Sequence, residues 1–278
     1  MRRTRSARAL AAVATAALLA ALPAAAGAAV STGHSGWSWA NPAPQGENLT
    51  DVAFAGATGY AVGDFGTLLR STDSGATWTG LPSTTFQGLT RVGVVGPTGV
   101  VASGACAVRR SVDSGATLTA VDVGGGDTGC GATIAGTAFA DPASGLIVFT
   151  SGVVLSTSDG GVTLARRTPV PGAPTDVAAV SPTTAYATSG TGIYRTIDGG
   201  GSWTLAALTA HPLRSITFAS PTVGYAVGDF GTVLKTIDGG GSWLPQASPD
   251  TSLPLAKVRC ADADLCLITT GTGASVVR

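Results

Sequence analysis

Short apolar segments alternate with turn residues along the chain after residue 48. In the first stretch, the predicted strands cover residues 49–54, 60–63, 67–71 and 77–81, with Gly, Ser, Asp and Thr between them. The apolar positions inside these segments are largely uninterrupted, which is typical of strands that are covered on both faces. Helix-forming residues are scarce, and Glu47 is the only glutamate among 278 residues. The pattern therefore predicts an all-β fold.

The same four-segment stretch returns with a period of about 40 residues. Its turn motif, Ser71-Thr-Asp-Ser-Gly-Ala-Thr-Trp78, recurs four more times with small changes, and the aspartates are spaced 40, 46, 39 and 40 residues apart. Four short antiparallel strands per period of this length indicate a β-propeller, in which repeated sheets (blades) surround an axis. We expect about six four-stranded blades, at residues 49–81, 89–121, 133–167, 175–206, 213–245 and 255–278.

The last repeat ends after its third strand. Residues 32–40 include Thr32-Gly-His-Ser-Gly-Trp-Ser-Trp39, which continues the motif where Arg278 ends, with His34 in the aspartate column. We therefore expect this N-terminal strand to close the last blade, so that residues 29–278 form a single propeller domain. Closure removes the open sheet edges that otherwise invite aggregation.

The first 28 residues have the pattern of a secretory signal peptide. Four arginines precede the apolar stretch 9–22, and the small residues Ala26-Gly27-Ala28 offer a cleavage site. We expect export by a cleaved signal to the extracellular space or the cell wall, without stable membrane insertion afterwards. An uncleaved anchor is the alternative.

Charge and cysteine content agree with an exported chain. Without the four arginines of the signal, 12 basic residues face 16 acidic ones, a net charge of −4, so nucleic acid is not an expected partner. Four cysteines suit an oxidising compartment. We expect a Cys260–Cys266 disulfide across one hairpin and, by default, a Cys106–Cys130 disulfide, with free buried thiols as the alternative.

The repeated aspartates are predicted to be structural. An Asp in a tight turn accepts hydrogen bonds from nearby amides and hydroxyls, while Gly supplies a positive φ. Each turn offers one carboxylate, whereas calcium requires several oxygens, so we expect no metal or cofactor. A basic column before the motif is expected to pack locally, although a polyanion-binding ring is conceivable. The aspartates are Asp73, Asp113, Asp159, Asp198 and Asp238, and the basic column is Arg70, Arg110, Arg195, Lys235 and Arg278.

The candidate binding site lies on the face opposite these turns. That face is expected to carry the second-to-third turns, with Asp64-Phe65 and Asp229-Phe230, and the links between blades. Charged residues near the starts of the inner strands would surround the channel mouth. The alternative is that the two aspartates only shape their turns and that the inner charges pair with each other. The inner-strand residues are Asp51, Arg91, Asp176, Arg214 and Lys257.

The turn motif S/T-x-D-x-G-x-T/S-W resembles the BNR/Asp-box repeat. The longer unit Gly-Tyr-Ala-Val-Gly-Asp-Phe-Gly-Thr, at 59–67 and 224–232, is similar to that of the photosystem II stability/assembly factor-like propellers, and more distantly the chain resembles the sialidase superfamily. The first resemblance implies a non-enzymatic assembly or stability scaffold that binds a protein or peptide. Those propellers usually have seven blades, whereas this sequence predicts six.

The sialidase resemblance implies the alternative, a carbohydrate-binding or glycoside-hydrolysing propeller. Sialidases use three arginines that bind the substrate carboxylate, a tyrosine nucleophile with a supporting glutamate, and an aspartate that acts as the acid. Here Glu47 lies in a link, and the tyrosines of the 59–67 and 224–232 units belong to a repeated strand pattern. Arg91, Arg214 and Arg259 lie on inner strands, so a glycan ligand stays an alternative.

Overall fold

The computed structural model describes residues 47–83, 85–95, 98–104, 107–121, 133–248, 252–260, 266–270 and 276–277. These residues lie within one compact unit that spans residues 43–278. Their regular structure is β-strand, apart from one short 3-10 turn, η1 (Asp64–Gly66), which confirms the predicted all-β class. The expected signal peptide, the expected closing strand at 32–40 and the expected Cys106–Cys130 disulfide lie outside the described residues. No helix in the described ranges is long and apolar enough to cross a membrane.

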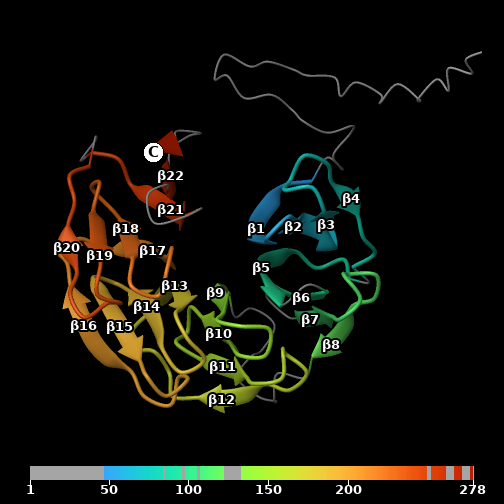
Figure 1. The fold of residues 1–278 in the computed structure, drawn as a ribbon, viewed down its shortest axis with the longest axis horizontal. Coiled ribbons are helices and arrows are strands. Elements are labelled where there is room, and N and C mark those ends of the chain that lie inside the picture. The colour runs from blue at the N-terminus through green and yellow to red at the C-terminus, as the bar shows by residue number, and fades with distance from the viewer. Residues whose placement is uncertain are drawn as a thin grey trace, which may run out of the picture. The chain divides into compact units, whose positions relative to one another are not determined.

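The strands form six antiparallel sheets in chain order, which we call blades 1 to 6 (Figure 1). The first three blades are β1 (Leu49–Ala55), β2 (Thr58–Gly63), β3 (Leu68–Ser71) and β4 (Thr79–Gly80); β5 (Leu89–Val95), β6 (Gly99–Gly104), β7 (Ala107–Ser111) and β8 (Thr119–Val121); and β9 (Ile134–Phe139), β10 (Gly145–Phe149), β11 (Val154–Thr157) and β12 (Ala165–Arg167). The next two are β13 (Pro174–Ala179), β14 (Ala185–Ser189), β15 (Gly192–Thr196) and β16 (Thr204–Leu208); and β17 (Leu213–Phe218), β18 (Gly224–Gly228), β19 (Val233–Thr236) and β20 (Leu244–Pro245). Blade 6 has β21 (Leu255–Cys260), β22 (Cys266–Thr270) and β23 (Val276–Val277) in the described residues.

The hydrophobic core is divided into clusters between successive blades. Between blades 1 and 2, for example, Tyr60 and Val62 pack against Leu89 and Val92, all at most 3% exposed. Four further clusters join the remaining neighbours up to blade 6. Because both faces of blades 2 to 5 are covered by neighbouring blades, their apolar positions need no strict alternation with polar ones. The predicted arrangement of about six propeller blades is confirmed by these sheets.

Each inner strand contains a β-bulge near its start. The pairing register shifts by one residue between the first and third residues of β1, β5, β9, β13, β17 and β21. A bulge adds an unpaired residue and redirects the side chains that follow it. The next paired residues therefore form one ring of equivalent positions, which we call the inner ring: Asp51, Arg91, Gly136, Asp176, Ser215 and Lys257.

Backbone hydrogen bonds define two faces of the propeller. On one, the turn before the fourth strand bonds to the first hairpin of its own blade, as in Ser74 N to Ala57 O, 2.9 Å. We call this the box face. On the other, the loop face, the second-to-third turn bonds to a link between blades, as in Gly231 N to Leu253 O, 2.8 Å.

Candidate functional site

The aspartate of each repeated turn is bonded within its own turn. The Asp198 carboxylate accepts hydrogen bonds from Thr196 Oγ1 (2.8 Å), Ser202 N (2.9 Å) and Ser202 Oγ (2.7 Å). The hydroxyl of Ser202 is the main cause that lowers the pKa of Asp198 to about 2, followed by the Ser202 amide. The other four turns repeat these bonds at equivalent residues. The carboxylates are thus satisfied separately, and the described residues contain no group of three potential metal ligands.

The repeated turns also hold successive blades together. Tyr186 Oη in blade 4 donates to the Gly239 carbonyl in the turn of blade 5 at 2.6 Å. A Cβ at Gly240 would overlap the Tyr186 ring, so glycine permits this close approach at a φ of 87°. The basic column lies nearby: Arg195 covers the Tyr186 ring, with 5.9 Å from its Cζ to the centroid. Arg278, the last member of that column, lies outside the described residues.

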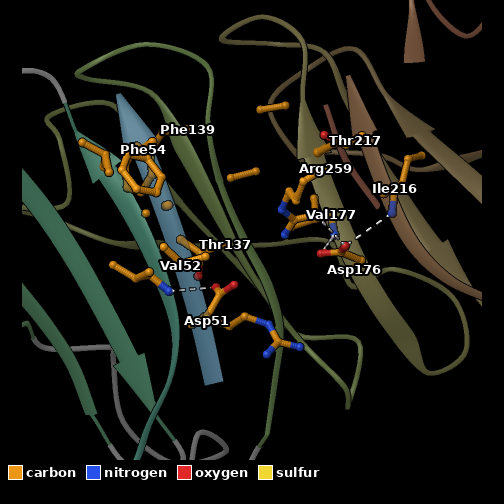
Figure 2. Close-up of a pocket in the computed structure, with 18 of the residues that line it drawn as sticks. Asp51, Val52, Phe54, Thr137, Phe139, Asp176, Val177, Ile216, Thr217 and Arg259 are labelled. Carbon is orange, nitrogen blue, oxygen red and sulfur yellow. Dashed lines mark hydrogen bonds and ion pairs between the residues drawn. The ribbon is translucent and has the colours of Figure 1, made fainter. Parts of the chain in front are cut away.

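A cavity of about 690 Å³ lies between the inner strands of all six blades. Figure 2 separates two regions of its wall. Asp51, Asp176 and Arg259 belong to a charged region, whereas Phe54 and Phe139 lie together in an aromatic region. The cavity is therefore amphipathic along its wall.

Asp176 is the most buried charged group of the cavity wall, with 2% of its side chain exposed. Its Oδ2 accepts from Ser215 Oγ (2.7 Å) and Ile216 N (3.3 Å), and it pairs with Lys257 Nζ (3.2 Å) and Arg259 Nη1 (3.6 Å). Burial raises the pKa of Asp176, but Lys257 and Arg259 outweigh it, so the pKa is lowered. Burial also lowers the pKa of Lys257, an effect that Asp176 partly offsets. This network links blades 4, 5 and 6.

Other inner-ring residues join neighbouring blades in a similar way. The Asp51 carboxylate accepts from Val92 N in blade 2 at 3.1 Å. Arg91 Nε donates to the Ala135 carbonyl in blade 3 at 2.9 Å. Ser215 Oγ accepts from Val258 N in blade 6 at 3.2 Å. The inner ring thus contributes polar bonds between blades, and three of its members, Asp51, Arg91 and Asp176, also line the cavity.

Arg214 lies outside this cavity, which corrects the expectation that it belongs with the inner charges. It is the bulged residue of β17, so Ser215 takes the inner-ring position. The Arg214 guanidinium instead pairs with the carboxylate of Asp229 at the loop face. Sequence reasoning named Arg259 only in connection with a glycan ligand, and it did not find Gly136, which takes the inner-ring position of blade 3.

The turns with Asp64-Phe65 and Asp229-Phe230 lie on the loop face. Asn48 Nδ2 donates to Asp64 Oδ2 at 3.0 Å, and Asp229 accepts from Arg214. Both phenylalanines have a φ of 52° and are 68% and 60% exposed, respectively. The two turns therefore display an aromatic ring while the neighbouring carboxylate is paired.

The Cys260–Cys266 disulfide joins β21 to β22 at directly paired positions. The cysteine spacing predicted this bond. Cys260 and Leu267 belong to the cavity wall beside Arg259, so the disulfide fixes the hairpin that brings this arginine to the site.

The fold and this wall of inner strands define a β-propeller. Neither a protein-family model nor a curated protein sequence matches the chain. Solved structures share the fold at low sequence identity. "YCF48 bound to D1 peptide" is 16% identical with a TM-score of 0.63, covering 81% of this chain and 75% of that one. YCF48 from Cyanidioschyzon merolae is 13% identical with a TM-score of 0.54, covering 84% and 95%.

Glycoside hydrolases of the propeller fold are similar to the same extent. The GH74 xyloglucanase from Xanthomonas campestris is 16% identical with a TM-score of 0.62, and the alignment covers 81% of this chain but 44% of the enzyme. At these identities the likeness establishes the fold, and it includes both YCF48 and hydrolases.

Proposed function

We propose that the protein is an exported, non-enzymatic propeller that binds a protein or peptide at the loop face and the adjoining cavity mouth. The observation that carries this proposal is the amphipathic cavity. Its wall has one region with charged residues on the inner strands, Arg91, Arg259, Asp51 and Asp176, and a second region with phenylalanines. Peptides present charged and apolar groups in close succession, so such a wall is complementary to them. The likeness to a YCF48 structure with a bound peptide supports the choice by analogy of fold only.

The state of the cavity carboxylates favours binding over hydrolysis. Glycosidases use a pair of carboxyl groups, one of which has a raised pKa so that it can donate a proton. Asp176 has a lowered pKa and interacts with four partners in blades 5 and 6. Asp51 accepts an amide of the next blade. Both cavity aspartates are thus committed to joining blades.

The binding proposal is tested with the mature chain, residues 29–278, as bait for the secreted and cell-wall fractions. A captured protein is then purified, and its affinity is measured for the parent chain, for Arg259→Ala and for Arg166→Ala. Arg259 lines the cavity, whereas Arg166 lies on the outer strand β12. Binding that weakens about tenfold only in Arg259→Ala supports the proposal. Equal binding by all three chains would contradict it.

A carbohydrate-active propeller is the second candidate, because hydrolases share the fold and aromatic rings line part of the cavity. The sialidase form of this idea needs three arginines on one carboxylate. Arg91 and Arg259 line the cavity, but Arg214 pairs with Asp229 at the loop face. Hydrolysis of a fluorogenic sialoside or of xyloglucan, abolished by Arg91→Ala, would overturn the non-enzymatic proposal.

Export rests on the N-terminal pattern of arginines, apolar residues and small residues. We expect an intact mass from the culture medium or cell wall that corresponds to a chain starting after Ala28. A full-length mass confined to the membrane fraction would instead indicate an uncleaved anchor.

A further inference from the structure

We propose that Phe65 and Phe230 are two apolar contact residues for the side chains of a bound peptide. The inference rests on the proposed binding function and names the residues and the ligand chemistry of the loop face. It starts from an observation in the backbone: both residues have a φ of 52°, the left-handed conformation that disfavours large side chains.

Other blades make the equivalent turn without this strain. Gly152 in blade 3 (φ 89°) and Gly190 in blade 4 (φ 55°) take the positive φ between their second and third strands. Glycine adopts that conformation readily because it has no Cβ. In blades 3 and 4 these glycines are the positive-φ residues of the turn, whereas blades 1 and 5 have a strained phenylalanine in addition to a positive-φ glycine, Gly66 or Gly231.

The turns do not need the aromatic rings for their own closure. Backbone bonds close them, from Thr67 N to Asp64 O (3.0 Å) and from Thr232 N to Asp229 O (3.1 Å). The Phe65 ring is 68% exposed and the Phe230 ring 60%, and Phe230 has His211 as a ring neighbour at 4.7 Å between centroids. The unfavourable backbone conformation of these residues is not offset by burial of their side chains, which points to a functional role.

The surroundings favour apolar side chains over a sugar. Sugars need convergent polar groups for their hydroxyls, but the nearest carboxylates are already bonded, Asp64 to Asn48 and Asp229 to Arg214. Further exposed apolar side chains are Phe86 on the link between blades 1 and 2 (92% exposed) and Leu208 at the end of β16 (67% exposed). Exposed apolar groups of this kind, rimmed by polar residues, mark protein-interaction sites.

The test uses linear 12-residue random peptides displayed on phage and the mature chain, residues 29–278. We expect the parent chain to select peptides with two apolar residues at a common spacing. A synthetic copy of a selected peptide is then titrated against Phe65→Gly, Phe230→Gly and the double variant. Each single change should weaken binding about tenfold, the scale of a hot-spot residue.

Thermal unfolding separates binding from a structural role. Glycine relieves the strained φ, so both variants should unfold at the same temperature as the parent chain or higher. A clear fall in that temperature would show that the rings are structural and would overturn the inference.

The matched control is the double variant Ile197→Ala and Ile237→Ala, which removes exposed apolar side chains (62% and 66%) from the box face. It should bind the selected peptide as the parent chain does. Equal loss in control and test variants would overturn the assignment to these phenylalanines. Selection of no peptide by the parent chain would overturn the proposed function as well, whereas selected peptides that bind unchanged to the glycine variants would overturn this inference alone.

Discussion

The repeated aspartates have a charge-dependent role at the scale of single residues. Asp73, Asp113, Asp159 and Asp198 have a pKa of about 2, first because of a hydroxyl hydrogen bond and then because of an amide in the same turn. Their unfolded pKa is near 3.9. A carboxylate with a depressed folded pKa stabilises the fold above the unfolded pKa and loses this effect as pH falls through the folded value.

We therefore expect the melting temperature to fall between about pH 4 and pH 2. Asp198→Asn should lower it by a few degrees at pH 7 and flatten this acid dependence, because the amide cannot accept all three bonds. Ile197→Ala in the same turn is the control, since that side chain is 62% exposed. Scanning calorimetry across the pH range measures both effects, and a fully retained acid dependence in Asp198→Asn would refute the explanation.

Asp176 presents the opposite situation, a charge buried among cations. Asp176→Asn should destabilise the protein by roughly 3 kcal/mol or more, because Lys257 and Arg259 lose their counter-charge. Urea unfolding of Asp176→Asn, Lys257→Met and the double variant forms a mutant cycle. The double variant should lose less than the sum of the single variants. Additive losses would mean that the contacts are energetically independent.

At the scale of strands, a phenylalanine–glycine pair recurs between the first and second strands of three blades. Phe54, Phe139 and Phe218 lie at or one residue before the ends of the inner strands and pair with Gly59, Gly145 and Gly224 on the next strand. A Cβ on any of these glycines would lie within 3 Å of the phenylalanine ring. Blade 4 has Ala179 opposite Ala185, and blade 6 has its disulfide at the same position. Blade 2 has Val94 opposite Val100 there, so one site in the ladder is filled in four different ways.

Gly145→Ala should consequently destabilise the protein by about 1–3 kcal/mol through overpacking against Phe139. Phe139→Ala combined with Gly145→Ala reproduces the alanine pair of blade 4, so it should cost less than the two changes added together. Gly80→Ala is the control, since a Cβ there meets open space. Denaturant unfolding is measured for the parent chain, Gly145→Ala, Phe139→Ala, the double variant and Gly80→Ala. A neutral Gly145→Ala would show that the ring moves aside at little cost.

The strand pattern predicted the six sheets and their approximate bounds because turn motifs and apolar segments recur in register. The bulge was not predicted, since a one-residue shift leaves the count of apolar positions almost unchanged. Because of this shift, Arg214 pairs with Asp229 in a turn of the loop face, whereas Ser215 takes the inner-ring position.

Threonines at the bulge in β1, β5 and β13 were a sequence signal for the bulge: Thr50 Oγ1, for instance, donates to the Leu89 carbonyl at 2.6 Å. Pairings across blades, such as Asp176 with Lys257, involve residues 81 positions apart and were beyond local patterns.

At the scale of the whole domain, one blade face differs from its equivalents. Val92 and Ile216 are 3% and 1% exposed because the preceding blade covers them, but Val52, at the same position in blade 1, is 46% exposed. Leu49 is 51% exposed, against 1% for the equivalent Leu89. In blade 6, Leu267 is 46% exposed, whereas the equivalent Tyr186 in blade 4 is fully buried. Both partly exposed faces belong to the blades at the two ends of the repeat.

We infer that these faces meet in solution when blade 6 is completed by residues 32–40, as the sequence pattern predicts. Val52→Asp should then cost stability as at a buried position, on the order of 3 kcal/mol or more. Leu205→Asp, on the outer strand β16 and 50% exposed, is the control and should change little. Deletion of residues 29–40 should remove the penalty, because it leaves Val52 exposed in the shortened chain. If light scattering showed a dimer that Val52→Asp dissociates, a second copy would be what covers this face. A monomer indifferent to both changes would mean that the ring stays open.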